Sequence, residues 1–367
     1  MAAAENVAAG TMDPVRAWAK YERRHRDVFD RYFDGWGDVH QRPVAAAMMV
    51  QTAERLGGSR LDWPGLFADA AVRITALVGG DFEVSVVVFV GVGTSNGWVT
   101  NLRRHATVFM AAELTARPPL DRVLIAHELT HAAQHLLKPE WEASDYPIEA
   151  HIFAEGLGTF VSELAYPGHH DDEYLWVDSA HQEWLRECDQ AWPSAAMALH
   201  AVLDDPCGGA IEQQFFSTRP TGESTTFPTR FGYYTGLRIV REAAAAATVA
   251  DMLTLDVSTA QQRVRHLLGQ SMGSPSLMVV ALPLSGTPAR GARPLRRTKT
   301  AKLLTGSCSR TFPRKRPRAF SVARIATGPS GRGKLAGPPR APPSRPSGPS
   351  APAATLSAPP CAPPPRT

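Results

Sequence analysis

The sequence predicts an α+β fold that is mainly helical, with a small β-sheet beside one central helix and a disordered C-terminal tail. Apolar residues recur at helical spacing in several segments before and after residues 82–90. Residues 82–90 form an unbroken, largely β-branched run that fits a buried strand. From about residue 273 the chain is rich in Pro, Arg and Ser. We therefore expect a flexible N-terminus over residues 1–12, one domain over residues 13–272, and a tail over residues 273–367.

Three helices are expected before the strand. An amphipathic helix begins at Asp13-Pro14 and runs to about Phe33. Two more span Pro43–Leu56 and Trp63–Leu77, each with Pro near its start and Gly past its end. Pro fits the first turn because its missing N–H has no helical partner there, and Gly tolerates the left-handed conformation that ends many helices.

A short sheet is expected next. Phe82–Val90 is the clearest strand of the chain, and the glycine-rich segment Gly91–Gly97 reads as a turn. Trp98–Leu102 then returns as the antiparallel partner of the first strand. The expected sheet is therefore small, and the helices must supply most of the core.

The segment His127-Glu128-Leu129-Thr130-His131 carries the strongest chemical signal. It lies within a predicted helix from Asp121 to about Leu137, with Pro before and after it. Positions i and i+4 share one helix face, so both imidazoles can reach a single metal ion. Zinc accepts neutral imidazole nitrogens, and the intervening glutamate can act as a base. The alternative is two helix histidines without a ligand role.

A third ligand is expected on the next helix, predicted from about Ile148 to Leu164. Glu155 lies among apolar neighbours there, and a buried carboxylate is costly unless it is paired or binds a metal. His151, one turn earlier, is the rival ligand. Gly156 and Gly158 weaken the helix but allow another backbone to approach closely. The preference of such sites for two His and one Glu favours Glu155, and hence a Zn²⁺ centre of His127, His131 and Glu155.

These motifs resemble a gluzincin-type metallopeptidase signature, and more narrowly the bacterial predicted zinc-dependent protease family catalogued as domain of unknown function 2268. The resemblance spans roughly residues 15–266. It includes Val86–Gly97, which resembles a strand and glycine-rich turn, Leu124–Leu129 at the start of the motif helix, and Gly232–Val240 downstream. It implies a zincin-like fold and a zinc metallopeptidase that hydrolyses peptide bonds of a peptide or protein substrate.

Within this hydrolase hypothesis, Glu128 is the general base that takes a proton from the attacking water. The developing oxyanion needs a further donor, and the candidates are Tyr233, Tyr234, Arg238 and His181. Each also has a structural interpretation, as a core aromatic or a solvated polar residue. The alternative function is a non-catalytic binding or regulatory protein that retains a peptidase-like zinc fold.

The segment Gly91–Asn101 is the candidate substrate edge. An exposed strand beside the motif helix can hold an extended peptide by backbone hydrogen bonds. The alternative is an ordinary hairpin that supports the core.

Charge is distributed unevenly along the chain. From Arg290 onward there are 17 basic and no acidic residues, which leaves 22 basic and 35 acidic residues in residues 1–289. The basic run at residues 314–318 has no interleaved aromatic residues, so we expect no specific nucleic-acid partner. No apolar stretch is long enough for a membrane span, the N-terminus lacks a signal pattern, and the four cysteines are sparse. These features favour a cytoplasmic protein.

Overall fold

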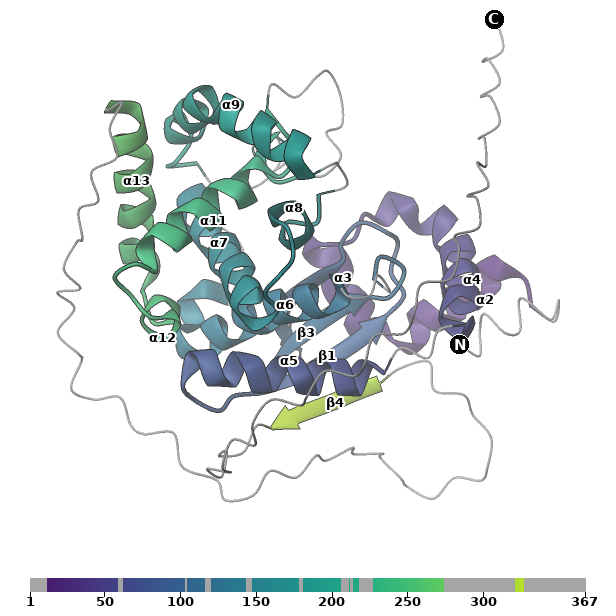
Figure 1. The fold of residues 1–367 in the computed structure, drawn as a ribbon. Coiled ribbons are helices and arrows are strands. Elements are labelled where there is room, and N and C mark those ends of the chain that lie inside the picture. Colours follow the sequence, from purple (N-terminus) through teal and green to yellow (C-terminus); the bar gives the residue numbers. More distant parts are fainter. Residues whose placement is uncertain are drawn as a thin grey trace, which may run out of the picture. The chain divides into compact units, whose positions relative to one another are not determined.

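The computed structural model describes residues 12–58, 62–102, 104–115, 120–142, 147–177, 181–205, 211, 214–217, 227–273 and 321–326. Helices dominate these residues, and a small sheet lies beside helix α6 (Figure 1). The α+β prediction is therefore confirmed in this general form. Residues 1–11 and most of the predicted tail lie outside the described residues, so the predicted flexibility of both stays a prediction.

The first predicted helix is two helices. α2 (Pro14–Arg24) and α3 (Arg26–Gly35) are separated at His25, whose φ of −119° and ψ of 37° leave the helical region. The break lets aromatic rings of both helices pack edge to face, with the ring centroids of Trp18 and Phe29 5.4 Å apart. The prediction of a single helix to Phe33 was therefore wrong. The apolar residues keep their helical spacing across His25, so the sequence pattern does not reveal the break.

The next two helices were predicted to within two residues at each end. α4 spans Arg42–Gly58 after the short 3-10 helix η1 (Val39–Gln41), and α5 spans Trp63–Val78. The side chain of Asp62 accepts a hydrogen bond from the N–H of Gly65 at the start of α5. Gly79 ends the helix in the left-handed region, at a φ of 77°.

The sheet differs from the prediction in its order. Its strands are β1 (Glu83–Phe89), β2 (Gly97–Leu102), β3 (His105–Ala111) and β4 (Ser321–Ala326), in the order β2-β3-β1-β4. β2 pairs antiparallel with β3, and β3 pairs parallel with β1, so the predicted pairing of β2 with β1 is wrong. The short connection between β2 and β3, with Arg104 at a φ of 69°, forms a hairpin and places β3 in the middle. β4, which pairs antiparallel with β1, comes from the predicted tail.

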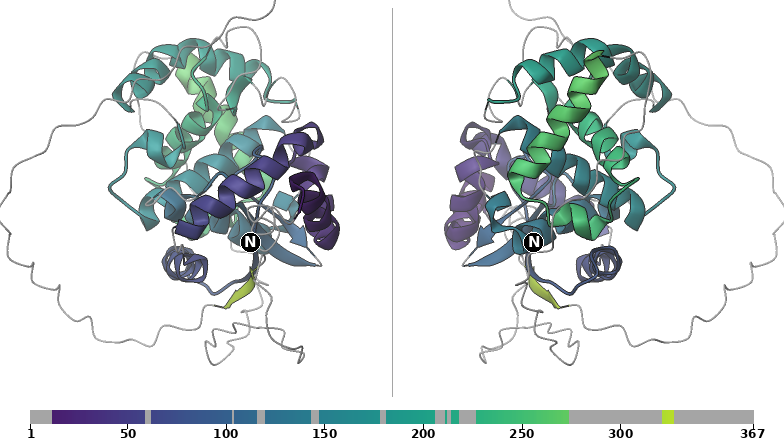
Figure 2. Two further views of the ribbon diagram at one scale, coloured as in Figure 1. Left: turned by 90° about the vertical axis from the view of Figure 1, so that its right-hand side faces the viewer. Right: turned by 90° about the vertical axis from the view of Figure 1, so that its left-hand side faces the viewer.

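Both faces of the sheet are covered. Side chains alternate along each strand, so Val86 and Val108 face a core formed with α5, α6 and α7. Val87 and Phe109 face a second core formed with α2, α3 and α4. Figure 2 shows the N-terminal helices, in purple, grouped away from the C-terminal helices, in green. Burial on both faces explains why β1 is an almost continuous apolar run.

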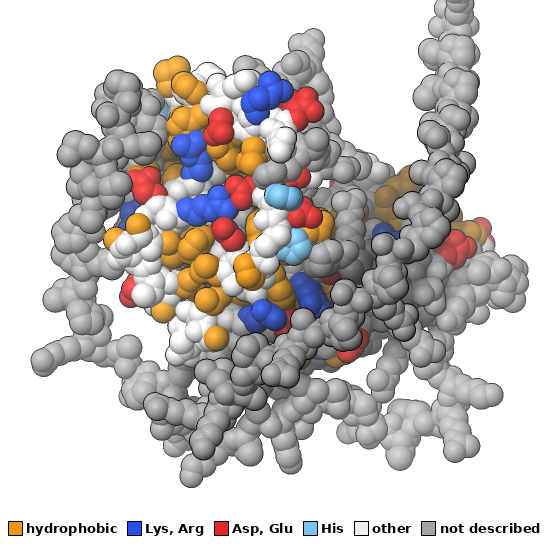
Figure 3. Space-filling model, viewed as in Figure 1, with side chains coloured by type: hydrophobic (Ala, Val, Ile, Leu, Met, Phe, Trp, Pro, Cys, Tyr) orange, Lys and Arg blue, Asp and Glu red, His pale blue; other side chains and the backbone are white. Residues whose placement is uncertain are grey.

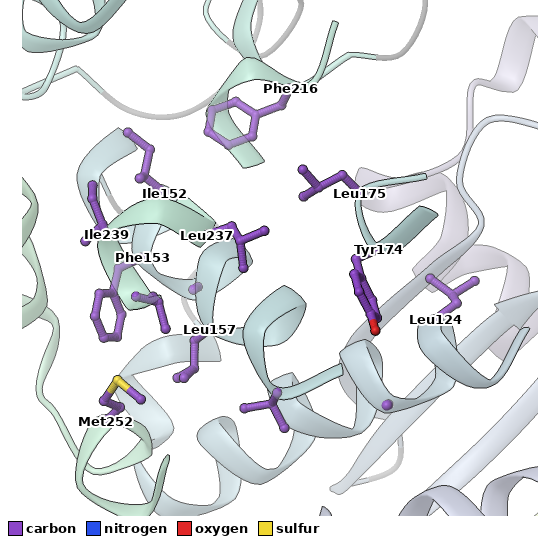
Figure 4. Close-up of a cluster of buried hydrophobic side chains, with 14 of the residues drawn as sticks. Leu124, Ile152, Phe153, Leu157, Tyr174, Leu175, Phe216, Leu237, Ile239 and Met252 are labelled. Carbon is purple, nitrogen blue, oxygen red and sulfur yellow. The ribbon is translucent and has the colours of Figure 1, made fainter. Parts of the chain in front are cut away.

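The remaining helices pack around α7 (Ile148–Ala165), which lies against α6 (Leu120–Leu137) and α11 (Phe231–Ala243). Figure 4 shows Phe153 and Leu157 of α7 beside Leu237 of α11 in the buried cluster. The other elements of this region are the short 3-10 helix η2 (Pro139–Glu142), α8 (Asp171–Tyr174), α9 (His181–Ala201), α12 (Val249–Leu253) and α13 (Val257–Gly273).

Ion pairs reinforce this helical region. Arg241 of α11 bridges Glu163 of α7 and Asp171 of α8, at 3.0 and 2.7 Å. Acidic and basic side chains lie intermixed on the described part of the face drawn in Figure 3. Among the described residues, no helix combines the length and apolar character needed to cross a bilayer.

Candidate metal centre

Helix α6 brings the two motif histidines together. His127 and His131 lie one turn apart, and their rings meet edge to face with centroids 4.7 Å apart. The two Nε2 atoms face each other at 3.0 Å. Apolar neighbours on α6, including Leu124 and Leu129, are buried in the core and fix the rotation of the helix. The sequence therefore places both imidazoles on one side of a rigid, buried element.

Helix α7 supplies Glu155 to the same point. Its Oε2 lies 3.0 Å from Nε2 of His127 and 3.6 Å from Nε2 of His131. All three side chains are only 12 to 13% exposed. Donor atoms on a tetrahedral zinc ion at about 2.0–2.2 Å lie about 3.3–3.6 Å apart. The separation of 3.6 Å lies in this range, and the two separations of 3.0 Å are shorter than it. The three donor types are those of a metal site with three protein ligands, and the group could hold a metal ion.

A hydrogen bond connects the two helices about two turns along α7 from Glu155 and one turn before His127 on α6. Ser162 Oγ of α7 donates to the carbonyl oxygen of Val123 of α6 at 3.1 Å. The same hydroxyl lies 2.8 Å from the carbonyl oxygen of Gly158 on its own helix. Contacts of this kind hold Glu155 in register with the histidines of α6.

The two glycines of α7 make different close contacts. A Cβ on Gly156 would overlap the backbone of Gly236 on α11, and a Cβ on Gly236 would overlap the carbonyl oxygen of Ile152. A Cβ on Gly158 would instead lie 2.9 Å from the His127 imidazole. The predicted close backbone approach therefore occurs at Gly156, whereas Gly158 makes room for a candidate ligand.

His151, the rival ligand, lies on the other side of the Glu155 carboxylate. Its Nε2 is 3.8 Å from Oε1 of Glu155, the oxygen that faces away from His127. Its ring packs edge to face on Phe216, with centroids 4.5 Å apart. Among the described residues, the group that can offer three ligand atoms to one ion is His127, His131 and Glu155. His151 therefore lies next to the Glu155 carboxylate but outside this group.

Burial and mutual charge set the protonation of the three candidate ligands. Burial lowers the pKa of His127, which favours the neutral imidazole that a metal requires. Burial alone would raise the pKa of Glu155, but the charge of His131 and the hydrogen bond from His127 hold it well below its usual value. Burial also opposes the charge on His131, yet the Glu155 carboxylate raises the pKa of His131 overall. A metal ion at this point would have to compete with a proton for His131, because only the neutral imidazole binds metal.

Glu128 lies beside the centre and is almost fully buried, at 4% exposure. Burial raises its pKa to about 8. Its carboxylate contacts the edge strand, because a Cβ on Gly97 would lie 2.8 Å from Oε1 of Glu128. Glu128 therefore lies between the candidate ligands of α6 and the first residue of β2.

The candidate substrate edge divides into two parts. Gly97–Asn101 lies in β2, which stands at one end of the strand order, so its outer side pairs with no other described strand. Gly91–Asn96 lies between β1 and β2, in agreement with the turn predicted for Gly91–Gly97, and the substrate role of the whole segment stays a prediction. Glu113 holds the loop by accepting hydrogen bonds from the N–H groups of Gly91 and Gly93, at 2.9 and 3.0 Å.

Two of the candidate oxyanion donors are engaged elsewhere. Tyr234 donates a hydrogen bond to Asp189 of α9 at 2.6 Å, and Arg238 pairs with the same carboxylate at 3.5 Å. The Arg238 guanidinium also lies over Trp192, 4.0 Å from the ring centroid. Both residues connect α11 to α9 through Asp189, and their prediction as transition-state stabilisers stays a prediction.

The other two candidates have different outcomes. Tyr233 packs against Phe216, with ring centroids 5.5 Å apart, and lies next to the core. His181 begins α9, but its side chain lies outside the described residues. Its prediction as an oxyanion donor therefore stays untested.

Arg230 is the residue near the centre that the sequence did not reveal. It stands at the N-cap of α11 with a φ of 55° and a ψ of 27°. After burial, its positive charge is one of the influences on both His127 and Glu128. A lone arginine before a glycine-tyrosine segment carries no motif, so its proximity could be found only from the fold.

In comparisons with known proteins, no family model, curated protein or solved structure matches the chain.

Proposed function

We propose that this protein is a zinc-dependent peptidase of zincin-like architecture that hydrolyses peptide bonds in a peptide or protein substrate. The observation that carries the proposal is the convergence of His127, His131 and Glu155 beside a buried carboxylate and an open strand edge. Two imidazoles and one carboxylate leave a fourth position free on a tetrahedral ion, as hydrolytic zinc sites require.

His127, His131 and Glu155 would hold the ion. When bound, zinc lowers the pKa of a coordinated water toward about 7 and polarises a substrate carbonyl. The burial of the three side chains supports this assignment, because a dry site strengthens electrostatic interactions. The lowered pKa values of His127 and Glu155 favour the deprotonated forms that bind metal, whereas the raised pKa of His131 means that a metal must compete with a proton there.

Glu128 is the proposed general base. Its carboxylate takes a proton from the attacking water and later gives that proton to the leaving amine. Without a metal, burial keeps the pKa of Glu128 near 8. A divalent cation beside it favours the charged carboxylate, and so brings the residue toward the ionised form that a base needs.

The outer edge of β2 is the proposed place for the substrate backbone. An extended peptide can add there as a further strand, because β2 pairs with a described strand on its inner side only. Gly97 has no side chain between this edge and Glu128. A peptide on the edge would therefore pass next to the carboxylate.

The test combines metal content with turnover of the full chain. Zinc-loaded protein should cleave members of a quenched fluorescent peptide library, and a chelator should stop the cleavage. Glu128→Gln should keep its zinc and lose at least about 100-fold in kcat/KM. Glu140→Gln, at an exposed carboxylate paired with Lys138, is the matched control and should keep both. Zinc binding with no cleavage of any peptide would favour a binding or regulatory protein instead.

A further inference from the structure

Arg230 has a backbone conformation that is unusual for a residue other than glycine. Its backbone is in the left-handed region, where a non-glycine side chain is strained, and such residues cluster at functional sites. The residue stands at the N-cap of α11, yet its side chain makes no capping hydrogen bond. Its backbone N–H donates to the carbonyl oxygen of Ser217 at 3.2 Å. Helix capping by the side chain therefore does not explain the strain.

The Arg230 guanidinium also lacks the partners that other arginines of this region have. Arg238 pairs with Asp189, Arg241 with Glu163 and Asp171, and Arg265 with Glu149 and Asp204. Among the described residues, no carboxylate pairs with Arg230, and its buried Nε finds no hydrogen-bond acceptor. Arg230 is half-buried, and leaving its buried Nε donor unsatisfied is costly, so this group is suited to a ligand that brings its own negative oxygen.

Aromatic contacts place Arg230 toward the metal centre. Its guanidinium carbon lies 4.6 Å above the ring of Tyr233, whose ring packs on Phe216 at 5.5 Å. Phe216 in turn packs on His151, which adjoins the Glu155 carboxylate. Tyr233, Phe216 and His151 therefore form a continuous series of contacts from the Arg230 guanidinium to the Glu155 carboxylate.

We propose that Arg230 binds a substrate oxyanion at the metal centre, through charge-assisted hydrogen bonds from its guanidinium. This inference rests on the proposed peptidase function and supplies a donor in addition to Tyr234 and Arg238, both of which contact Asp189. The oxyanion has two possible sources, the tetrahedral adduct formed at the cleaved carbonyl or the free C-terminal carboxylate of the peptide. Both present negative oxygens that a guanidinium recognises in the same way.

The experiment compares Arg230→Met with Arg238→Met, the same change on the same helix but at the Asp189 contact. Both zinc-loaded full-length variants are assayed for metal content and unfolding midpoint. Binding of a phosphinate-bridged peptide, a stable mimic of the tetrahedral adduct, is measured by calorimetry. Cleavage is measured on two peptides that differ only in a free or amidated C-terminus. The phosphinate readout needs no turnover, so failure of Arg230 is distinguishable from failure of the proposed hydrolysis.

We expect Arg230→Met to keep its zinc and to bind or cleave at least one anionic probe about 10- to 100-fold more weakly. Weaker phosphinate binding together with slower cleavage of both peptides would mean that Arg230 binds the tetrahedral adduct. Slower cleavage of the free-acid peptide alone would mean that Arg230 binds the terminal carboxylate. Arg230→Lys should recover part of the loss, because it keeps the charge but not the fork of donors. Weakening of every probe by Arg238→Met to the same degree would contradict a specific role for Arg230.

A second variant keeps the proposal testable if Arg230→Met fails to fold. Glycine accepts the backbone conformation of residue 230 without strain, so Arg230→Gly is the second variant and should fold. Full phosphinate binding and full cleavage of both peptides by either folded variant would overturn the inference. So would a zinc-loaded wild-type protein that binds none of the probes.

Discussion

Gly158 of α7 lies directly against the imidazole of His127 on α6, so close that a single added Cβ would come within 2.9 Å of its Cε1 and Nδ1 atoms. Real Cβ contacts are almost never this short. The imidazole would have to move, and with it the ring nitrogen that faces His131 and Glu155. A residue without a side chain is therefore part of the candidate metal centre.

Gly158→Ala should weaken zinc binding although alanine is the better helix former. The added methyl displaces the His127 ring, and we expect the zinc Kd to rise at least about 10-fold, as when the support of a metal ligand is lost. A competition titration with a chromogenic chelator measures this. Gly269→Ala on α13, where a Cβ would meet nothing within 4 Å, is the control and should leave the Kd unchanged. Equal zinc affinity in the two variants would refute the role of Gly158.

Gly156→Ala should destabilise the fold itself. A Cβ there overlaps the backbone of Gly236, so α7 and α11 must separate. Overpacking of this kind costs about 1–3 kcal/mol, and more where backbone rather than a side chain blocks the space. Urea unfolding followed by circular dichroism gives the free energy of unfolding. A value equal to that of the wild type would mean that the helices do not cross here.

The local pattern of the motif helices was enough to predict them. The helices of residues 121–137 and 148–164 agree with α6 and α7 to within one residue, because apolar periodicity and i, i+4 spacing are local properties. The three candidate ligands followed from that spacing together with the known preference of zinc. Glu155 and the histidines converge because helices α6 and α7 return on each other.

Features set by long-range packing could not be predicted in the same way. β3 enters the sheet between β2 and β1 because of a short hairpin, and no local pattern specifies that order. Tyr234 and Arg238 have side chains typical of oxyanion donors, but the orientation of α11 turns them toward Asp189. Arg230 was not among the predicted site residues, because its position depends on where α11 begins relative to the other helices. Residue types predicted which chemical groups could act, whereas tertiary packing determines where each side chain points.

Glu128 should make the stability of the metal-free protein depend on pH. Burial raises its pKa from 4.5 to about 8, so across this window the folded protein keeps a proton that the unfolded chain releases. The free energy of unfolding should therefore fall as the pH rises, by up to about 1.4 kcal/mol per pH unit from this one group. The decline should end above the folded-state pKa of about 8.

Glu128→Gln isolates this contribution because glutamine does not titrate. Urea unfolding of both proteins in chelator, at about pH 5 and about pH 8, should show a smaller decline for the variant. Equal declines would show that the carboxylate is not held protonated in the folded protein.

The most direct measurement of the central claim is the zinc content of the full chain and of Glu155→Ala, by elemental analysis after dialysis against trace zinc. We expect about one zinc per chain in the wild type, since three buried donors converge on one point. Glu155→Ala should lose most of it, and Glu163→Ala, also on α7 but paired with Arg241, should keep it. Full zinc retention by Glu155→Ala, or no zinc in the wild type, would contradict the metal centre and the hydrolysis proposed for it.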